Sequence, residues 1–313
     1  MEFSFGPVPS RRLGRSLGIN NIIPKTCSYS CIYCQLGKTI NFTSTRKKFY
    51  DPDELVSSVR KRVNELEKNG IIIDYLTFVP DGEPTLDINL ENEIRMLKEL
   101  GIKIAVITNS SLIYDEDVRN ALYLANFVSL KVDTVKNDIW KKINVPHRDL
   151  NLDKILSGIR EFSKNYHGTL ATETMLINGI NDNNFDETAK FIGEIRPHTS
   201  YISVPTRPPA FDFVKIPDEY KIIEAYETFK RFIDNVQTLT DFEGENFVTL
   251  ENTLNDILDI ISVHPMREDV LLKILSDKGM GLNDLESLIN KGLIKKENYG
   301  GKIFYIKKFK GFS

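Results

Sequence analysis

Three cysteines are the residues of this chain whose type and spacing could best do chemistry. They lie in one eight-residue window, at Cys27, Cys31 and Cys34, with the spacing C-x3-C-x2-C. Three thiolates are one fewer than the four that complete a structural zinc site or a simple ferredoxin cluster. An iron–sulfur cluster held here would keep one iron open to a small molecule. Such a cluster could do chemistry on that molecule rather than only pass electrons.

The number of cysteines also indicates the redox compartment in which the protein works. The chain has three cysteines in 313 residues, so none lies outside the window to pair with it. This pattern favours metal ligation in a reducing compartment over disulfides. No apolar run approaches the roughly 18 residues that span a bilayer, and residues 1–7 lack the apolar core of a signal peptide. We therefore expect a cytoplasmic protein with no membrane segment.

Basic residues gather around the cysteine window. Residues 1–48 hold eight Lys or Arg and one acid, Glu2, although the whole chain has a formal net charge of −3. Such a segment could attract an anionic substrate such as nucleic acid. In the alternative, these side chains pair with acids of the same domain. The sequence favours neither interpretation.

Strand and helix signals alternate through the middle of the chain. Asp51 and Pro52 predict a helix start and Gly70 the residue after its end. Six buried segments read as strands with helices between them, which predicts a parallel sheet covered by helices. Because eight such units close a complete barrel, six predict a partial (β/α)6 TIM-like barrel with its chemistry at the carboxyl ends of the strands. The expected strands are 16–23, 71–79, 103–107, 127–132, 169–177 and 201–204, and further helices are expected at 91–100, 115–124, 151–165 and 184–194.

Polar and charged residues recur where these strands end. Each group taken alone is ordinary loop chemistry. Because the carboxyl ends of parallel strands meet at one edge of a sheet, we expect the groups to converge on one cavity beside the cysteines. They are Asp81 to Thr85 after the second strand, 108–111 after the third, Lys131 and Asp133 at the fourth, Glu173 on the fifth and 204–209 after the sixth.

The cysteine motif resembles that of a known superfamily. C-x3-C-x2-C with an aromatic residue, Tyr33, before the last cysteine resembles the defining pattern of radical S-adenosylmethionine (radical SAM) enzymes. Residues 5–14 and 204–209 resemble a subgroup of Fe–S oxidoreductases near the wyosine-type tRNA-modifying enzymes. The resemblance covers about residues 3–235 and is strongest at the cysteines. It implies a [4Fe–4S] cluster on the three thiolates, whose remaining iron binds the amino and carboxylate groups of SAM.

The resemblance also implies where SAM lies. Residues 82–84, Gly-Glu-Pro, resemble the motif that binds the SAM amino group, with Asp81 where that motif usually has its first glycine. Tyr33 is expected near the adenine, although it could equally be an aromatic cover of the cluster. By the same analogy, the cofactor-binding residues are Tyr33, Gly82, Glu83, Pro84, Asn109, Lys131, Asp133, Glu173, Val204 and Pro205.

The implied reaction needs partners as well as cofactors. One electron cleaves SAM to a 5′-deoxyadenosyl radical, which abstracts a hydrogen atom from a substrate, so we expect a one-electron donor of the flavodoxin or ferredoxin type. The substrate is expected to be tRNA or a protein or peptide. Arg207 could reach an anionic substrate, but an Arg between prolines is more often a solvated residue at a rim. None of the four histidines is expected to bind a metal.

The last part of the chain departs from the alternating pattern. Helix signals at 264–276 and 281–291, followed by a hairpin at 293–308, predict a winged-helix-like domain. Its second helix carries Asp284 and Glu286, which suits DNA poorly, so a protein-contact or lid function is favoured over nucleic-acid binding. We expect a barrel over 1–235, a linker over 236–254 and this small domain over 255–313.

Two other classes of protein compete with the enzyme hypothesis. An electron-transfer or redox-sensing Fe–S protein with a winged-helix interaction module would need a fourth cluster ligand and no SAM pocket. A DNA-binding regulator with a metal sensor would need a basic recognition helix. The residues at the strand ends argue against the first, and the acidic helix argues against the second.

Overall fold

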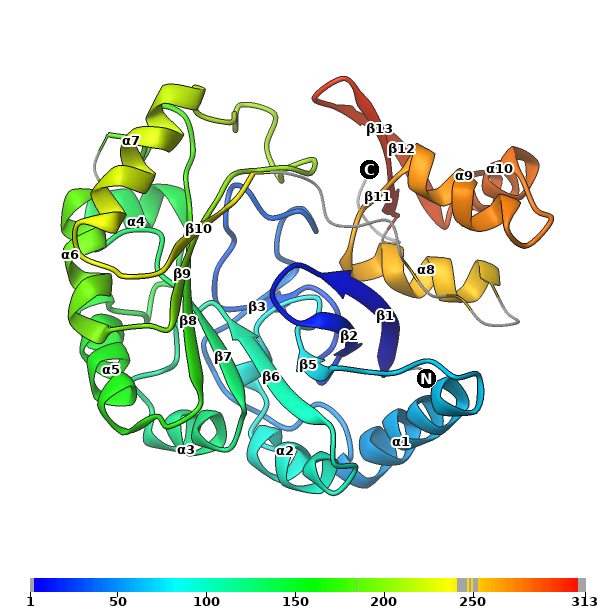
Figure 1. Cartoon of the computed structure of the whole chain (residues 1–313), viewed down its shortest axis with the longest axis horizontal. Helices are drawn as coiled ribbons and strands as arrows, with labels where there is room; N and C mark the ends of the chain where they lie inside the picture. The colour runs from blue at the N-terminus through cyan, green and yellow to red at the C-terminus, as the bar shows by residue number, and fades with distance from the viewer. Residues whose placement is uncertain (1–2, 184, 241–246, 248, 250–252, 309–313) are drawn as a thin grey trace.

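A curved, eight-stranded sheet is the main feature of the computed structural model, which describes residues 3–183, 185–240, 247, 249 and 253–308 (Figure 1). The strand order is β1-β2-β5-β6-β7-β8-β9-β10. β1 pairs with β2 antiparallel, and all later neighbours are parallel. The strands are β1 (Ser4–Ser10), β2 (Gly14–Ile19), β5 (Tyr75–Phe78), β6 (Lys103–Thr108), β7 (Phe127–Lys131), β8 (Thr169–Met175), β9 (Thr199–Ser203) and β10 (Val236–Leu239).

Helices follow the outer side of the curved sheet (Figure 1). α1 begins where the side chain of Asp51 accepts a hydrogen bond from the backbone NH of Asp53, and it buries Leu55, Val59 and Leu66. The remaining helices bury similar apolar faces, although Ile139 and Ile143 of the fourth helix pack with Ile32 of the cysteine loop. The helices of this layer are α2 (Leu90–Lys98), α3 (Glu116–Tyr123), α4 (Asn137–Ile143), α5 (Leu152–Asn165), α6 (Asp186–Ile195) and α7 (Glu219–Lys230), after α1 (Pro52–Lys68).

The two faces of the sheet carry different side chains, one packed against the helices and the other facing the inner side. Side chains alternate along each strand, so on β6 Ile104 and Val106 belong to the large core between sheet and helices. Ala105 belongs instead to a second cluster, which also includes Tyr201 and Leu13 from the β1–β2 turn. This second cluster fills part of the inner side of the sheet. The carboxyl ends of the strands are left to line a cavity.

The mixed α/β fold with a parallel sheet is confirmed, with differences at the edges. The second expected strand, 71–79, is shorter, because Tyr75 is the first residue that pairs with both β2 and β6. A seventh parallel strand, β10, pairs with β9. The expected linker over 236–254 was wrong at its start, since 236–239 belongs to the sheet. Most of 241–252 lies outside the described residues.

The C-terminal elements have a core of their own. They are α8 (Thr253–Val263), β11 (Met266–Arg267), α9 (Glu268–Ser276), α10 (Leu282–Asn290), β12 (Ile294–Tyr299) and β13 (Lys302–Lys307), with the strand order β11-β13-β12. Buried side chains such as Ile260, Leu271 and Tyr305 form this core. An ion pair of 2.7 Å from Arg62 on α1 to Asp256 on α8 joins these elements to the sheet domain. Within the described residues, no helix is long and apolar enough to cross a membrane.

Candidate active site

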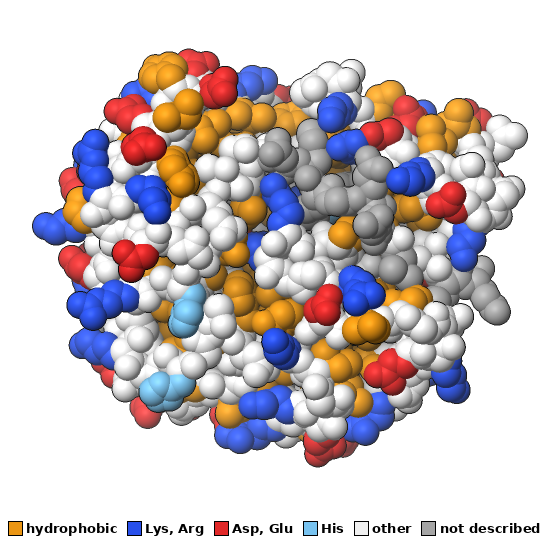
Figure 2. All heavy atoms as spheres, viewed as in Figure 1, with side chains coloured by type: hydrophobic (Ala, Val, Ile, Leu, Met, Phe, Trp, Pro, Cys, Tyr) orange, Lys and Arg blue, Asp and Glu red, His pale blue; other side chains and the backbone are white. Residues whose placement is uncertain are grey.

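One cavity of about 380 Å³ collects residues from all the expected regions. Its wall combines the β1–β2 hairpin, the cysteine loop, the strand ends and the start of the C-terminal elements. Figure 2 shows hydrophobic and basic side chains near the centre of this face, between the arc of helices and the C-terminal elements. The expected site residues that line the cavity are Cys27, Cys31, Tyr33, Cys34, Gly82, Asn109, Lys131, Glu173, Val204 and Pro205.

Backbone hydrogen bonds hold the cysteine loop against the end of α4. The NH of Ser30 donates to the carbonyl of Asn144 at 3.1 Å, and the NH of Ile32 donates to Ile143 at 3.0 Å. Cys27 ends the short strand β3 (Thr26–Cys27), which pairs with β4 (Asn41–Phe42). The loop is therefore held at its start and in its middle, and its thiols lie on the cavity wall.

The three thiols form no disulfide. Burial raises the pKa of each of them, that of Cys31 to about 12. They are therefore neutral until a metal displaces their protons. Two amides face them: Asn109 Nδ2 lies 3.5 Å from Cys27 Sγ, and Asn144 Nδ2 lies 3.5 Å from Cys31 Sγ. Such donors tune the potential of thiolate-bound iron.

The donor set suits a cluster better than a single ion. Among the described residues, no three His, Cys, Asp or Glu side chains are grouped so that they could hold a metal ion. A cluster of several irons takes each cysteine on a different iron, so its thiols stand farther apart than the ligands of one ion. Three thiols on one cavity wall are the donors that a cluster with one open iron takes, whereas a closed zinc site takes four protein ligands.

Gly82 brings the loop after β5 into contact with the cysteine loop. The NH of Glu83 donates to the carbonyl of Thr26 at 3.1 Å, and the NH of Lys25 donates to the carbonyl of Asp81 at 2.7 Å. A Cβ on Gly82 would lie only 1.8 Å from the carbonyl oxygen of Thr26, which is backbone and adjoins Cys27. Glycine is required here because no side chain fits between the two loops.

Gly82→Ala should therefore lower stability and cluster content together. Overpacking of this kind costs about 1–3 kcal/mol or more, and the displaced backbone leads directly to Cys27. Thermal unfolding and iron per chain after reconstitution measure the two effects. Gly281→Ala is the control, because a Cβ at Gly281 meets nothing within 4 Å. Equal behaviour of the two variants would contradict the required close approach.

Glu83 and Pro84 do not line the cavity. The carboxylate of Glu83 accepts hydrogen bonds from the NH and hydroxyl of Thr85, from the hydroxyl of Thr108 and from the NH of Asn109, at 2.6–3.0 Å. Burial raises its pKa, and these four donors act against that shift. Glu83 therefore ties the end of β5 to the end of β6.

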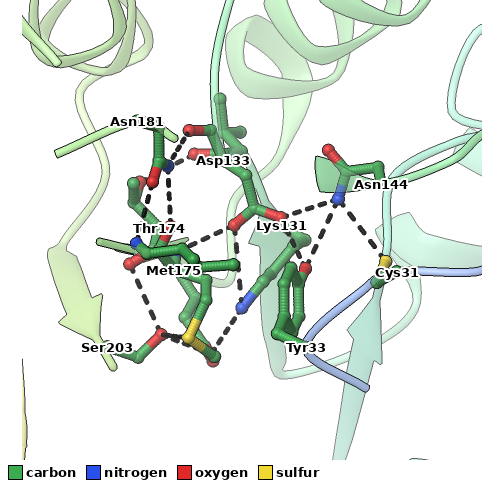
Figure 3. Close-up of polar contacts among 12 residues, drawn as sticks. Cys31, Tyr33, Lys131, Asp133, Asn144, Thr174, Met175, Asn181 and Ser203 are labelled. Atoms are coloured by element: carbon green, nitrogen blue, oxygen red, sulfur yellow. Dashed lines mark hydrogen bonds and ion pairs between the residues drawn. The ribbon is translucent and has the colours of Figure 1, made fainter. Parts of the chain in front are cut away.

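Ion pairs connect the ends of β7 and β8 to the N-terminal hairpin. Figure 3 shows Lys131 and Ser203 of this network, together with the neighbouring contacts of Asp133. Glu173 accepts from Lys131 Nζ at 2.7 Å and pairs with Arg12 at 2.5 Å. Ser203 Oγ donates to the same carboxylate at 3.0 Å. Burial alone would raise the pKa of Glu173, but Lys131 and Arg12 hold it well below its usual range. Burial alone would lower the pKa of Lys131, yet Glu173 and Asp133 raise it.

Asp133 lies next to this network, and its carboxylate fixes the positions of three neighbouring groups by hydrogen bonds. Its carboxylate accepts from the hydroxyl of Tyr33 at 2.5 Å, from Asn144 Nδ2 at 2.7 Å and from the NH of Met175 at 2.8 Å. The side chain of Asp133 is fully buried and does not line the cavity. It fixes the position of Tyr33 through its hydrogen bond, and its expected contact with SAM stays a prediction. Lys131 Nζ stands 5.1 Å above the Tyr33 ring.

Several residues at the site were not predicted. Arg12 was noted only as part of a basic segment, and Asn144 carried no signal in the sequence. Arg207, expected at a rim, lines the cavity and contacts both Gln35 and His264 at 2.9 Å. His264 lies 230 residues after Cys34 in sequence and still reaches the same wall. Arg207 belongs to residues 204–209, the group after the sixth strand that was expected to reach the cavity, but its contacts with Gln35 and His264 had no sequence signal.

The structure is an α/β fold in which three cysteines line a cavity at the carboxyl ends of parallel strands. The family model described as the radical SAM superfamily matches residues 21–192, more than half of the chain. The chain belongs to the radical SAM superfamily. It is accordingly an enzyme whose cofactors are a [4Fe–4S] cluster and SAM.

The chain is also similar to individual curated proteins and to solved structures. It is 48% identical to the UPF0026 protein MJ1312 of Methanocaldococcus jannaschii, over 99% of this chain and 97% of that protein. It is 30% identical to a UPF0026 protein of Helicobacter pylori (strain J99), over 96% of each. Among solved structures, a radical SAM methyltransferase from Sphaerobacter thermophilus shares the fold, with a TM-score of 0.52, 13% identity, and coverage of 72% of this chain and 66% of that one.

Proposed function

We propose that this enzyme holds its cluster on Cys27, Cys31 and Cys34 and cleaves SAM reductively. The observation that carries the proposal is that all three thiols and the polar strand ends line one cavity. One electron from an external donor, passed through the cluster, splits SAM into methionine and a 5′-deoxyadenosyl radical, which takes a hydrogen atom from the substrate to form 5′-deoxyadenosine. An electron donor of the flavodoxin or ferredoxin type is proposed with it.

The protein's part in this chemistry is to bind, orient and exclude water. Lys131, Glu173 and Asn109 stand at adjoining strand ends, where we propose that they contact the carboxylate and ribose of SAM. Val204 and Pro205 offer an apolar wall for the adenine. Tyr33 is held by Asp133 between the cysteine loop and Lys131. This position supports a role as cover for the bound cofactor.

Reductive cleavage is the direct test. Reconstituted anaerobically and given dithionite and SAM, the protein should release 5′-deoxyadenosine and methionine in equal amounts. The product should not appear without reductant, because no electron then reaches the sulfonium. An intact cluster that yields no 5′-deoxyadenosine would leave an electron-transfer protein as the better description.

The substrate is proposed to be tRNA or a protein. The charge argument for tRNA is weaker in the structure, because basic residues near the cysteines are paired with acids of the same chain: Arg12 with Glu173, Arg15 with Asp74 and Arg46 with Asp115. Crosslinking to total tRNA at low salt separates the classes, since phosphate contacts strengthen as salt falls. Absence of tRNA binding there would leave protein as the substrate class.

We also propose that residues 255–313 form a winged-helix-like domain that covers the cavity. The element order α8-β11-α9-α10-β12-β13 and the sheet order β11-β13-β12 support this fold. Tyr299 OH donates to the carbonyl of Pro205 at 2.8 Å, and Gln35 Nε2 donates to the carbonyl of Val263 at 2.9 Å. Because both contacts end on the cavity wall, they support a lid function over DNA binding.

A further inference from the structure

An exposed strand lies directly beside the cysteine loop. β4 pairs with β3, so that Phe42 is the partner of Cys27, and the NH of Thr43 donates to the carbonyl of Cys27 at 3.1 Å. Both residues of β4, Asn41 and Phe42, are exposed. Among the described residues, no further strand pairs with the other edge of β4. On this side of the loop, Cys27 is therefore one strand away from solvent.

β4 belongs to a longer, mostly exposed segment, residues 38–48, which we call the outer strip. Two of its apolar side chains are open to solvent, since Ile40 is 40% and Phe42 is 41% exposed. The segment continues to the loop after β5, where the NH of Lys47 donates to the carbonyl of Leu86 at 2.9 Å. Of the strip, only Thr39 lines the cavity. The outer strip is thus a surface that a ligand in the cavity leaves free.

The outer strip is also positively charged. Three of its lysines are exposed and make no ion pair within the described residues: Lys38, Lys47 and Lys48. The ammonium groups of Lys38 and Lys47 stand over aromatic rings, at 4.7 and 5.1 Å from the ring centroids, and Lys48 interacts by charge with the buried Asp87. Residues 3–50 contain no Asp or Glu. Such a surface attracts a partner with an acidic face.

We propose that the outer strip is the docking surface of the one-electron donor, a small carrier protein with an acidic face. This inference rests on the proposed function. Ile40 and Phe42 form the apolar centre of the contact, and the lysines form its charged rim, as is usual in protein interfaces. A carrier docked there stands beside Cys27 while SAM and substrate keep the cavity. One electron passes from the carrier, which is oxidised, to the cluster, which is reduced, and no atom is transferred.

Two other occupants suit the outer strip less well. A tRNA substrate must place its reacting nucleotide in the cavity, which the strip touches only at Thr39, and the side chains of Ile40 and Phe42 offer phosphates no hydrogen-bond donor. A second copy of the chain related by a two-fold axis would bring the lysines of the strip close to the same lysines. Like charges facing each other across an interface are unfavourable. An acidic carrier meets neither difficulty.

Formation of 5′-deoxyadenosine with two different reductants tests the docking surface. Dithionite is a small ion that needs no docking, whereas reduced flavodoxin is an acidic protein that does. Lys47→Glu/Lys48→Glu should lower kcat/KM for reduced flavodoxin at least about tenfold and leave the rate with dithionite within about twofold. Lys164→Glu/Lys190→Glu is the control: it changes the charge equally at exposed lysines of α5 and α6 and should react with both reductants as the wild type does.

The apolar part of the contact has its own variant. Phe42→Ser leaves the backbone pairing with Cys27 in place. It should raise KM for reduced flavodoxin at least about fivefold, with the rate under dithionite unchanged, because a buried aromatic residue often dominates an interface. Phe232→Ser is the matched control, since Phe232 is 44% exposed and lies against Gly193 of α6.

Several results would overturn the docking surface. Wild-type flavodoxin kinetics in both strip variants would place the contact elsewhere, and an equal loss with both reductants would make the strip a structural support of the cluster. Loss of tRNA crosslinking at low salt with unchanged flavodoxin kinetics would make it a nucleic-acid surface. A wild type active with dithionite but not with reduced flavodoxin or ferredoxin would exclude such a carrier. If the wild type with an intact cluster forms no 5′-deoxyadenosine with dithionite, the proposed function fails instead.

Discussion

Replacing Cys31 with Ala should reduce 5′-deoxyadenosine formation to the level without enzyme, a loss of at least about a thousandfold or about 4 kcal/mol in barrier. Two thiolates cannot hold a cluster that already lacks a fourth protein ligand, and the chain has no further cysteine to take over. The same result is expected for Cys27→Ala and Cys34→Ala. Iron and sulfide per chain, the visible absorption of the cluster and chromatography of the nucleoside measure it.

Ser30→Ala is the control for the cysteine variants. Ser30 lies inside the same loop, and its side chain accepts only a 3.3 Å hydrogen bond from the NH of Thr39. The backbone bonds from Ser30 to α4 do not involve that hydroxyl. Cluster content and nucleoside formation should thus stay near wild type. A Cys31→Ala protein that kept full cluster absorption would refute the ligand assignment.

The parts of the site that could be predicted are those that are local in sequence. The cysteine spacing needs only eight residues, and a buried run followed by polar residues marks the end of a strand. Because parallel strands end at one edge, Asn109, Lys131 and Glu173 could be placed together without a structure. All three line the cavity with the cysteines.

Contacts between distant segments could not be predicted, because packing alone decides them. The motif predicts Glu83 near the ligand, but its hydrogen bonds with Thr108 and Asn109 of the next strand depend on packing and carry no sequence signal. Arg12 meets Glu173 across 161 positions. His264 reaches the wall only because the C-terminal elements dock beside the β1 strand. No local sequence pattern predicts such a contact.

The pairing of Glu173 with two cations makes it the most sensitive residue of the network. Glu173→Gln should destabilise the protein by about 3–5 kcal/mol, because it leaves the largely buried Arg12 without its carboxylate partner and leaves Lys131 with the more distant carboxylate of Asp133 at 3.8 Å. Chemical unfolding at pH 7 measures the loss. Glu194→Gln is the matched control: its ion pair with Arg160 is 3.0 Å long but about half exposed, so its loss should be below about 1 kcal/mol.

The pH dependence of stability separates the charge of Glu173 from its shape. Since the folded-state pKa of Glu173 is lowered, its contribution is complete above its unfolded pKa of about 4.3 and is lost as the pH falls toward the folded value. Lys131 does not affect this acid range. Because its folded-state pKa is raised, its contribution to stability is lost only as the pH rises through that pKa. The wild type should therefore lose stability below about pH 4.3 more steeply than Glu173→Gln does. If the free energies of unfolding of the two proteins fell equally with pH in this acid range, the charge of Glu173 would not contribute to stability.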